Sequence, residues 1–190
     1  DAVAALPKGI RENEKAVAET IENNVRKLII DEQPIDPKYY EKMSELLDAL
    51  IEQRKQEAMD YQKYLEEIVE LTRKVKNPSA GDSYPKALNT PAKRALYNNL
   101  GKNEVLALEV DRAVRVSRQD DWRGNSMKIK KVKLAIKAVL EKHKTEFKSG
   151  PDGFADPSRE VPAVYAVKNG KRSNELADQV LELVKKQNEY

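Results

Sequence analysis

The sequence predicts an all-α protein, and three observations carry this prediction. Apolar residues recur at spacings of three and four along most of the 190 residues, which is the period of an amphipathic helix. The pairs Asp36-Pro37 and Thr90-Pro91 each combine a capping side chain with a proline suited to a first helical turn. Phenylalanine, tryptophan and long β-branched runs, which strands favour, are scarce. We therefore expect a single irregular helical domain of about seven helices.

The first three helices are expected between residues 13 and 76. The first follows the N-cap Asn13 and ends before Pro34, the second begins at Asp36-Pro37, and the third follows the N-cap Asp60. Their inward faces are, in order, Val17, Ile21, Val25, Leu28 and Ile29; Tyr40, Met43, Leu46, Leu47, Leu50 and Ile51; and Tyr64, Leu65, Ile68, Leu71, Thr72 and Val75. Tyr39 and Tyr40 are adjacent, so one is expected to pack inward and the other to face solvent or a partner.

Four more helices are expected after a loop at residues 77–85, which holds two prolines and a glycine. A short helix runs from Thr90-Pro91 to a stop at Gly101, and the next restarts at Asn103 and ends near Ser117. A basic helix begins near Ser126, with Ile129, Val132, Ile136, Val139 and Leu140 on its buried face. A last helix is expected at residues 174–186.

A segment rich in glycine and proline interrupts this pattern before the last helix. Residues 145–172 hold three glycines and three prolines with few large apolar groups, a composition that rarely offsets the entropy of ordering. We expect a helical core at 1–144, an exposed excursion at 145–172 and a C-terminal helix at 173–190 that packs back on the core. Residues 161–167 alternate weakly and form at most a short strand.

The composition excludes several classes of protein. There is no cysteine, so disulfides and thiolate metal sites are absent and a reducing, cytoplasmic location is expected. No stretch approaches the ~20 apolar residues of a membrane span, and no secretory signal is visible. The chain starts at Asp1 rather than methionine, which we interpret as a piece of a longer protein or a trimmed N-terminus.

No catalytic constellation is visible in the sequence. His143 is the only histidine, which excludes a histidine-rich metal site, and its place among lysines at a helix end fits an interaction with the helix dipole. Gly101-Lys102 lacks the remainder of a phosphate loop. Pro151-Asp152 and Glu146-x-Lys148 have the reverse order of a metal-dependent nuclease site and lie among glycines and prolines. We therefore expect no catalytic residue, no metal and no cofactor in this chain.

Positive charge is concentrated around the basic helix. Residues 123–148 hold nine Lys or Arg against Glu141 and Glu146, although the net charge of the whole chain is only +3. Such a face can follow the phosphates of DNA, while the plainer interpretation is that these lysines keep the helix soluble. The predicted phosphate contacts are Arg123, Lys128, Lys130, Lys131, Lys133 and Lys137. Binding to a membrane surface is disfavoured, because the stripe lacks the aromatic residues of an inserting face.

Trp122 and the acidic segment before the basic helix allow a different interpretation. At the junction of a loop and a helix, Trp122 serves either as a plug of the core or as an anchor at an interface. Residues 31–70 hold twelve acidic and five basic residues, the reverse of the basic helix. The lysines can therefore meet acidic residues on a partner or elsewhere in the same chain.

Four short motifs carry a resemblance to a known family. They are Glu22-Asn23-Asn24-Val25-Arg26-Lys27, Pro37-Lys38-Tyr39-Tyr40-Glu41-Lys42-Met43, Leu96-Tyr97-Asn98-Asn99-Leu100 and Trp122-Arg123-Gly124-Asn125. Taken in this order, they resemble the C-terminal helical domain of the R (HsdR) subunit of type I restriction-modification enzymes. The likeness covers residues 7–140 and resumes in the final helix up to Tyr190. The excursion at 145–172 has no counterpart in the pattern.

The resemblance implies a non-catalytic part of a large DNA-handling machine. In that family the complete subunit is an ATP-dependent type I site-specific deoxyribonuclease, with a nuclease domain and two motor domains ahead of this region. The implied partners are the methyltransferase and specificity subunits, the motor domains of the same chain, and duplex DNA. Residues expected to form the protein-docking surface are Arg26, Lys27, Tyr39, Met43 and Trp122. The alternative is a purely protein-docking module with no direct contact to DNA.

Overall fold

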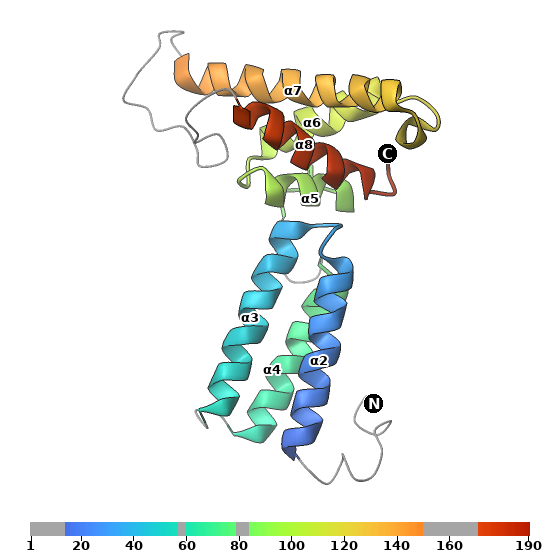
Figure 1. Cartoon of the computed structure of the whole chain (residues 1–190). Helices are drawn as coiled ribbons and strands as arrows, with labels where there is room; N and C mark the ends of the chain where they lie inside the picture. Colours follow the sequence, from blue (N-terminus) through green and yellow to red (C-terminus); the bar gives the residue numbers. More distant parts are fainter. Residues whose placement is uncertain (1–13, 57–59, 79–83, 150–170) are drawn as a thin grey trace. The chain divides into compact units, whose positions relative to one another are not determined.

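The computed structural model describes residues 14–56, 60–78, 84–149 and 171–190, and for 145–149 and 171–173 it describes the backbone alone. The described residues form seven α-helices, one 3-10 helix and no strand, so the predicted all-α class is confirmed (Figure 1). The elements are α2 (Glu14–Glu32), α3 (Pro37–Lys55), α4 (Tyr61–Lys76), α5 (Pro91–Asn99), α6 (Glu104–Ser117), η1 (Trp122–Gly124), α7 (Ser126–Ser149) and α8 (Lys171–Lys185).

Side-chain caps fix most of the helix starts. Asp36, Asp60, Thr90 and Asn103 each accept a hydrogen bond from the main-chain N–H three residues ahead, at 2.9 to 3.3 Å. These bonds satisfy donors that the first turn of a helix leaves without a partner. The starts predicted from the sequence at these four positions are therefore confirmed. The predicted cap Asn13 lies outside the described residues.

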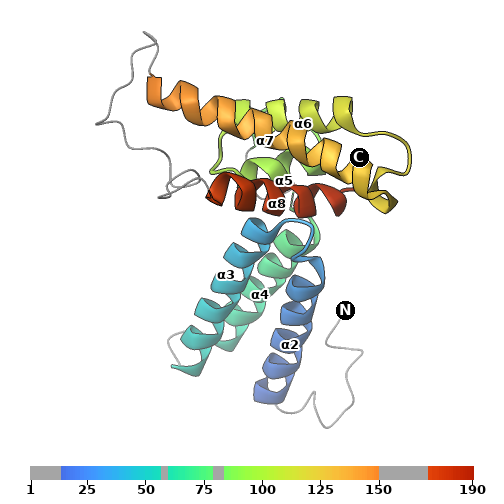
Figure 2. The ribbon, with the colours of Figure 1, turned by 45° about the horizontal axis from the view of Figure 1, so that its top comes forward.

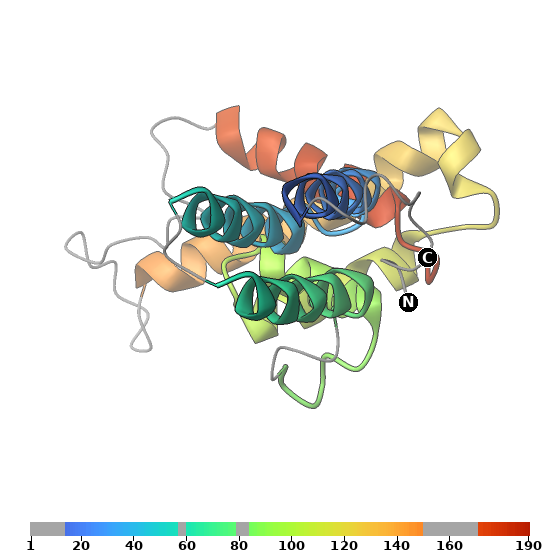
Figure 3. The same ribbon diagram turned by 90° about the horizontal axis from the view of Figure 1, so that it is seen from below.

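The helices divide into two compact units, and each has its own hydrophobic core. Unit 1 is Asp1–Ser83 and unit 2 is Tyr84–Tyr190. In unit 1, each of α2, α3 and α4 packs on the other two, and Figure 3 shows these three helices nearly end-on. The core of unit 1 consists of Ala18, Val25, Ile29, Tyr39, Tyr40, Met43, Leu47, Leu50, Tyr64, Ile68, Leu71 and Val75.

Tyr39 and Tyr40 are both buried, each with 4% of its surface exposed, so the expectation that one of them faces solvent is wrong. The Tyr39 hydroxyl donates to the carbonyl of Lys74 at 2.8 Å, and the Tyr40 hydroxyl donates to the carbonyl of Val75 at 3.3 Å. These carbonyls belong to the last turn of α4, where a helix has no internal donors left. Adjacent tyrosines can both be buried because α4 supplies an acceptor for each hydroxyl.

A second buried polar group lies between the three helices of unit 1. Arg54 donates to both carboxylate oxygens of Glu22, at 2.7 and 3.1 Å, and the Tyr64 hydroxyl donates to the same carboxylate at 3.1 Å. The Arg54 guanidinium also lies over the Tyr64 ring, 5.7 Å from its centroid. Since Glu22 is 6% exposed, its charge is compensated almost entirely by these two side chains.

In unit 2, α6 packs on α5 and α7, while α8 packs on α7 and α5 (Figure 2). The short connection between α5 and α6 needs two residues of positive φ, Gly101 (φ 69°) and Lys102 (φ 59°), and glycine occupies the first at no steric cost. The buried core comprises Leu88, Ala92, Ala95, Leu96, Leu100, Leu106, Ala107, Val110, Val114, Trp122, Val132, Ile136, Leu140, Ala177, Val180, Leu181, Leu183, Val184 and Tyr190. The predicted return of the C-terminal helix to the core is therefore present in unit 2.

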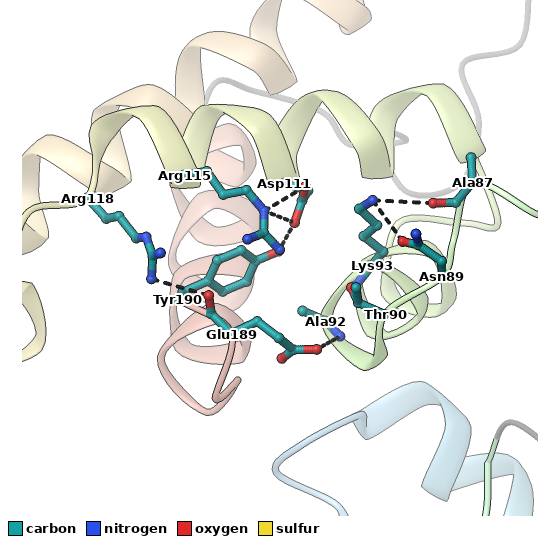
Figure 4. A network of polar contacts seen from close by, with 10 residues as sticks. All are labelled: Ala87, Asn89, Thr90, Ala92, Lys93, Asp111, Arg115, Arg118, Glu189 and Tyr190. Carbon is teal, nitrogen blue, oxygen red and sulfur yellow. Dashed lines mark hydrogen bonds and ion pairs between the residues drawn. The ribbon is translucent and has the colours of Figure 1, made fainter.

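Residues after α8 are tied to α5 and α6 by polar contacts (Figure 4). The Tyr190 hydroxyl donates to Asp111 at 2.6 Å, and Arg115 donates to both oxygens of the same carboxylate at 3.0 Å. The Glu189 side chain accepts the main-chain N–H of Ala92 at 3.1 Å, in the first turn of α5. These bonds join residues that are 79 and 97 positions apart in the sequence.

The segment predicted as an excursion is shorter than expected in the backbone that is described. Helix α7 continues to Ser149 and α8 begins at Lys171, so both ends of the predicted 145–172 loop are helical. Glu146 and Lys148 are good helix formers, and no glycine or proline occurs before Gly150, so α7 continues past Lys144. Residues 150–170, including the predicted weak strand at 161–167, lie outside the described residues.

Among the described helices, none has both the length and the apolar character needed to cross a membrane.

Candidate docking and nucleic-acid interface

The basic helix α7 has a core face that agrees with the sequence pattern. Val132, Ile136 and Leu140 are at most 2% exposed, and Ile129 and Val139 pack against the same core while half-buried. The buried stripe predicted from the sequence is confirmed. Because this stripe fixes how α7 is rotated, it also decides where each lysine of the helix lies.

Two of the predicted phosphate contacts are engaged on the side of α7 that meets α8. The ammonium group of Lys133 lies 2.5 Å from the carboxylate of Asp178 on α8, and that of Lys137 lies 3.6 Å from Glu141 on α7 itself. Both lysine side chains are 32% exposed. These residues therefore meet acidic groups of their own chain, as the docking interpretation allowed.

The opposite side of α7 meets Glu109 on α6. His143 Nε2 and Lys142 Nζ lie 2.9 and 3.4 Å from this carboxylate. Burial raises the pKa of Glu109, but the hydrogen bonds from His143 and Lys142 outweigh it, so the pKa is lower than usual. The expected role of His143 at the helix end is wrong, because α7 continues to Ser149 and the imidazole links two helices instead.

The outer face of α7, by which we mean Met127, Lys130, Lys131, Leu134 and Ala138, is exposed to solvent. Met127 is 75% exposed and Leu134 is 55% exposed. Lys130 and Lys131 form no ion pair with any described residue. Five residues at helical spacing thus present apolar and basic groups side by side, on a helix held rigidly by its opposite face.

Arg123 and Lys128, the remaining predicted phosphate contacts, bind main-chain carbonyls. Arg123 donates to the carbonyls of Lys185 at 3.0 Å and Gln187 at 2.6 Å, which holds the residues after α8. Lys128 Nζ donates to the carbonyl of Asp120 at 2.6 Å. A carbonyl is a neutral acceptor, so both side chains keep their positive charge for other interactions while being held in place.

Three of the five residues predicted for protein docking lie in the cores. Tyr39 and Met43 are 4% and 2% exposed, and Trp122 is 2% exposed, so these side chains are not available to a partner at the surface. Trp122 fills the core of unit 2, as the first of its two interpretations stated. Of the other two, Arg26 pairs with Asp48 at 2.6 Å and Lys27 is exposed. Apolar spacing alone could not tell these buried residues from interface anchors.

Sequence reasoning did not find a hollow beside the end of α6. It has a volume of about 520 Å³ and its lining includes Arg115, Arg118, Trp122, Arg123 and Tyr190. Arg118 donates to the carbonyl of Glu189 at 3.2 Å, and the Arg115 and Arg123 guanidiniums lie 5.2 and 5.1 Å from the ring centroids of Tyr190 and Trp122. The hydrogen bonds with Asp111 raise the pKa of Arg115. Arg115 and Arg118 lie three residues apart at the end of α6, but this spacing alone does not indicate a hollow.

The search for a metal site and the comparisons with known proteins identify nothing further. No cluster of three or more histidine, cysteine or acidic side chains suited to a metal occurs in the described ranges. The chain matches no protein-family model, no curated protein and no solved structure. The properties of the surface itself must therefore carry the functional argument.

Proposed function

We propose that this chain is a non-catalytic assembly domain of a motor subunit like those of type I restriction-modification enzymes. It docks that subunit on the methyltransferase and specificity core through the outer face of α7. The observation that carries the proposal is the exposure of Met127 and Leu134 beside Lys130 and Lys131. The four sequence motifs support the choice of family, and the exposed groups of the outer face support it as the place of contact.

The mixture of groups on the outer face favours a protein partner over DNA alone. Burying exposed apolar surface yields roughly 25 cal/mol per Å², and a phosphate backbone offers no apolar surface in return. Lysines beside the apolar groups steer a partner and select its orientation. The matching surface is therefore an acidic one with apolar side chains at its centre.

Co-purification with the methyltransferase and specificity subunits in the absence of DNA tests this function. We expect the 190-residue chain to be retained by that complex, and the double variant Leu134→Glu with Lys131→Glu to be lost from it. Val105→Glu is the matched control, because Val105 is 60% exposed on α6 of the same unit and lies outside the outer face. Retention of the double variant, or equal loss of the control, contradicts the proposal.

Direct contact with duplex DNA is the second candidate function, and the unpaired state of Lys130 and Lys131 among the described residues favours it. Each phosphate neutralised by a lysine contributes about 0.9 to the slope of log K against log salt concentration. We expect Lys130→Ala with Lys131→Ala to reduce that slope by about 2 in a duplex titration. The control is Lys55→Ala with Lys76→Ala, which removes the same charge from unit 1. Binding that ignores salt, or an equal effect of the control, excludes this function.

A further inference from the structure

The hollow beside the end of α6 is lined by three arginines and two aspartates. Of its three arginines, Arg115 is paired with Asp111. Arg118 and Arg123 donate to main-chain carbonyls, and neither pairs with a carboxylate in the described part of the chain. A guanidinium has five N–H donors in a planar fork, so both keep donors for a ligand.

The same hollow is lined by a tryptophan with an unsatisfied polar group. The indole N–H of Trp122 is buried and has no hydrogen-bond partner among the described residues. A buried donor without a partner is rare in folded proteins and is often satisfied by a water molecule or an ion. The N–H has almost no accessible surface, so the indole lines the hollow without offering this donor to a ligand.

We propose that this hollow binds a phosphate oxyanion, held by the guanidiniums of Arg118 and Arg123. A phosphate carries more negative charge and more acceptor oxygens than a carboxylate, so two guanidinium forks together favour it. The stacking of Arg123 on Trp122, at 5.1 Å from the ring centroid, fixes one fork before the ligand arrives. The phosphate belongs either to the backbone of DNA or to a free phosphate ester.

Removing the charges of two acidic residues that line the hollow should have the opposite effect on phosphate binding to removing its arginines. Asp120 and Asp121 also line the hollow, and their charges oppose the entry of an anion. Asp121 has a left-handed backbone (φ 52°), which asparagine adopts as readily as aspartate. Replacing both by asparagine should therefore strengthen phosphate binding without a change in backbone geometry.

This inference is separate from the docking function, because the hollow shares no residue with the outer face of α7. Where the phosphate is that of DNA, the inference deepens the second candidate function and rests on it. The DNA-contact function and the oxyanion site can be tested separately. A Lys130 and Lys131 variant that no longer binds DNA should still bind inorganic phosphate at the hollow.

The single tryptophan of the chain gives a direct readout in solution. In a ¹⁵N-labelled 190-residue chain, the indole N–H of Trp122 produces one resonance, which we follow during titration with inorganic phosphate and, in a second series, with acetate. We expect a saturable shift with phosphate and at least tenfold weaker binding of acetate. No saturable shift with phosphate, or equal binding of acetate, overturns the proposal.

Variants connect the signal to the arginines. Arg118→Ala with Arg123→Ala should weaken phosphate binding at least tenfold, and Asp120→Asn with Asp121→Asn should strengthen it severalfold. Arg112→Ala on the same helix is the control, since Arg112 is exposed and does not line the hollow. Because Arg123 also holds the residues after α8, the pair Arg118→Lys with Arg123→Lys is measured beside it and should keep part of the affinity. An unchanged affinity in both arginine variants, or weaker binding in the asparagine variant, overturns the proposal.

A duplex of defined length distinguishes the source of the phosphate. If the site takes the backbone of DNA, the duplex displaces inorganic phosphate from the hollow and shifts the same indole resonance. If the site takes a free phosphate ester, phosphate stays bound in the presence of duplex. Either outcome supports an oxyanion site, and each assigns it to one ligand.

Discussion

Tyr40, Tyr64 and Tyr190 each bury a hydroxyl next to an oxygen acceptor. Their acceptors are the carbonyl of Val75, the carboxylate of Glu22 and the carboxylate of Asp111. Burial, together with the nearby charges of Glu32 and Asp36, raises the pKa of Tyr40 to about 12. Burial and the adjacent carboxylates also raise the pKa values of Tyr64 and Tyr190. Ionisation of any of the three places a negative charge in a core.

The raised pKa values predict a loss of stability in alkaline solution. The unfolded tyrosine releases its proton near pH 10 while Tyr40 in the folded chain keeps it to about 12, so its contribution is complete below pH 10 and is lost as the pH rises through 12. Between these limits the free energy of unfolding falls by about 1.4 kcal/mol per pH unit for each such tyrosine. Urea denaturation at pH 9 to 12 should show a shallower fall for Tyr40→Phe than for the parent chain.

The buried ion pair between Glu22 and Arg54 should be costly to break. Their side chains are 8% and 14% exposed, so Arg54→Met leaves the Glu22 carboxylate in the core without its counter-charge. We expect a loss of about 3 kcal/mol in the free energy of unfolding, measured by urea denaturation followed by circular dichroism. Arg26→Met is the control, because its pair with Asp48 is half-exposed and such pairs contribute at most ~1 kcal/mol. Equal effects of the two substitutions would show that burial does not govern this pair.

At the scale of the helices, the sequence predicted where elements begin better than what they touch. The caps Asp36, Asp60, Thr90 and Asn103 act through bonds that span three residues, so local sequence contains the whole signal. The partner of Lys133 is Asp178, which lies on another helix, and the two hydroxyls of Tyr39 and Tyr40 depend on the end of α4. Contacts of this kind arise only when helices pack, and no local pattern records them.

Helix α7 should show a sharp contrast between its two faces. Ile136 is fully buried in the core of unit 2, so Ile136→Ala removes packed atoms and should lower the free energy of unfolding by 2 to 5 kcal/mol, as is typical of such truncations. Leu134 lies on the outer face and is 55% exposed, so Leu134→Ala should change it by less than about 0.5 kcal/mol. Chemical denaturation of both variants measures the difference. A large effect of Leu134→Ala would mean that the outer face already packs within the chain.

For the whole molecule, composition along the chain predicted one part of the candidate site, while the other part depends on the fold of unit 2. Charge counts located α7 and its lysines, because composition is visible along the chain. The hollow combines the end of α6 with η1 and Tyr190, which are brought together only by the fold of unit 2. The Arg118 and Arg123 pair therefore could not be recognised as one site from its spacing.

The two cores should respond separately to mutation. The only tryptophan lies in unit 2, so its fluorescence reports the unfolding of that unit, while circular dichroism reports both. We expect Arg54→Met to lower the midpoint of unit 1 in the dichroism signal and to leave the fluorescence midpoint unchanged. The reverse is expected for Ile136→Ala, which lies in the core of unit 2. Coincident shifts by both probes would mean that the units unfold as one cooperative body.

The bonds that join Tyr190 to Asp111 and Glu189 to Ala92 impose an order on folding during synthesis. The described helices of unit 1 are complete once residue 76 has left the ribosome, and its core is built from neighbours in the sequence. Unit 2 can complete its core only after α8 and the four residues after Lys186 have been synthesised. Tyr190 and Glu189 bond to residues that lie 79 and 97 positions earlier in the sequence. Until then the apolar faces of α5, α6 and α7 are without their last partner, so the emerging chain is most exposed to chaperones and proteases between the synthesis of α7 and that of α8.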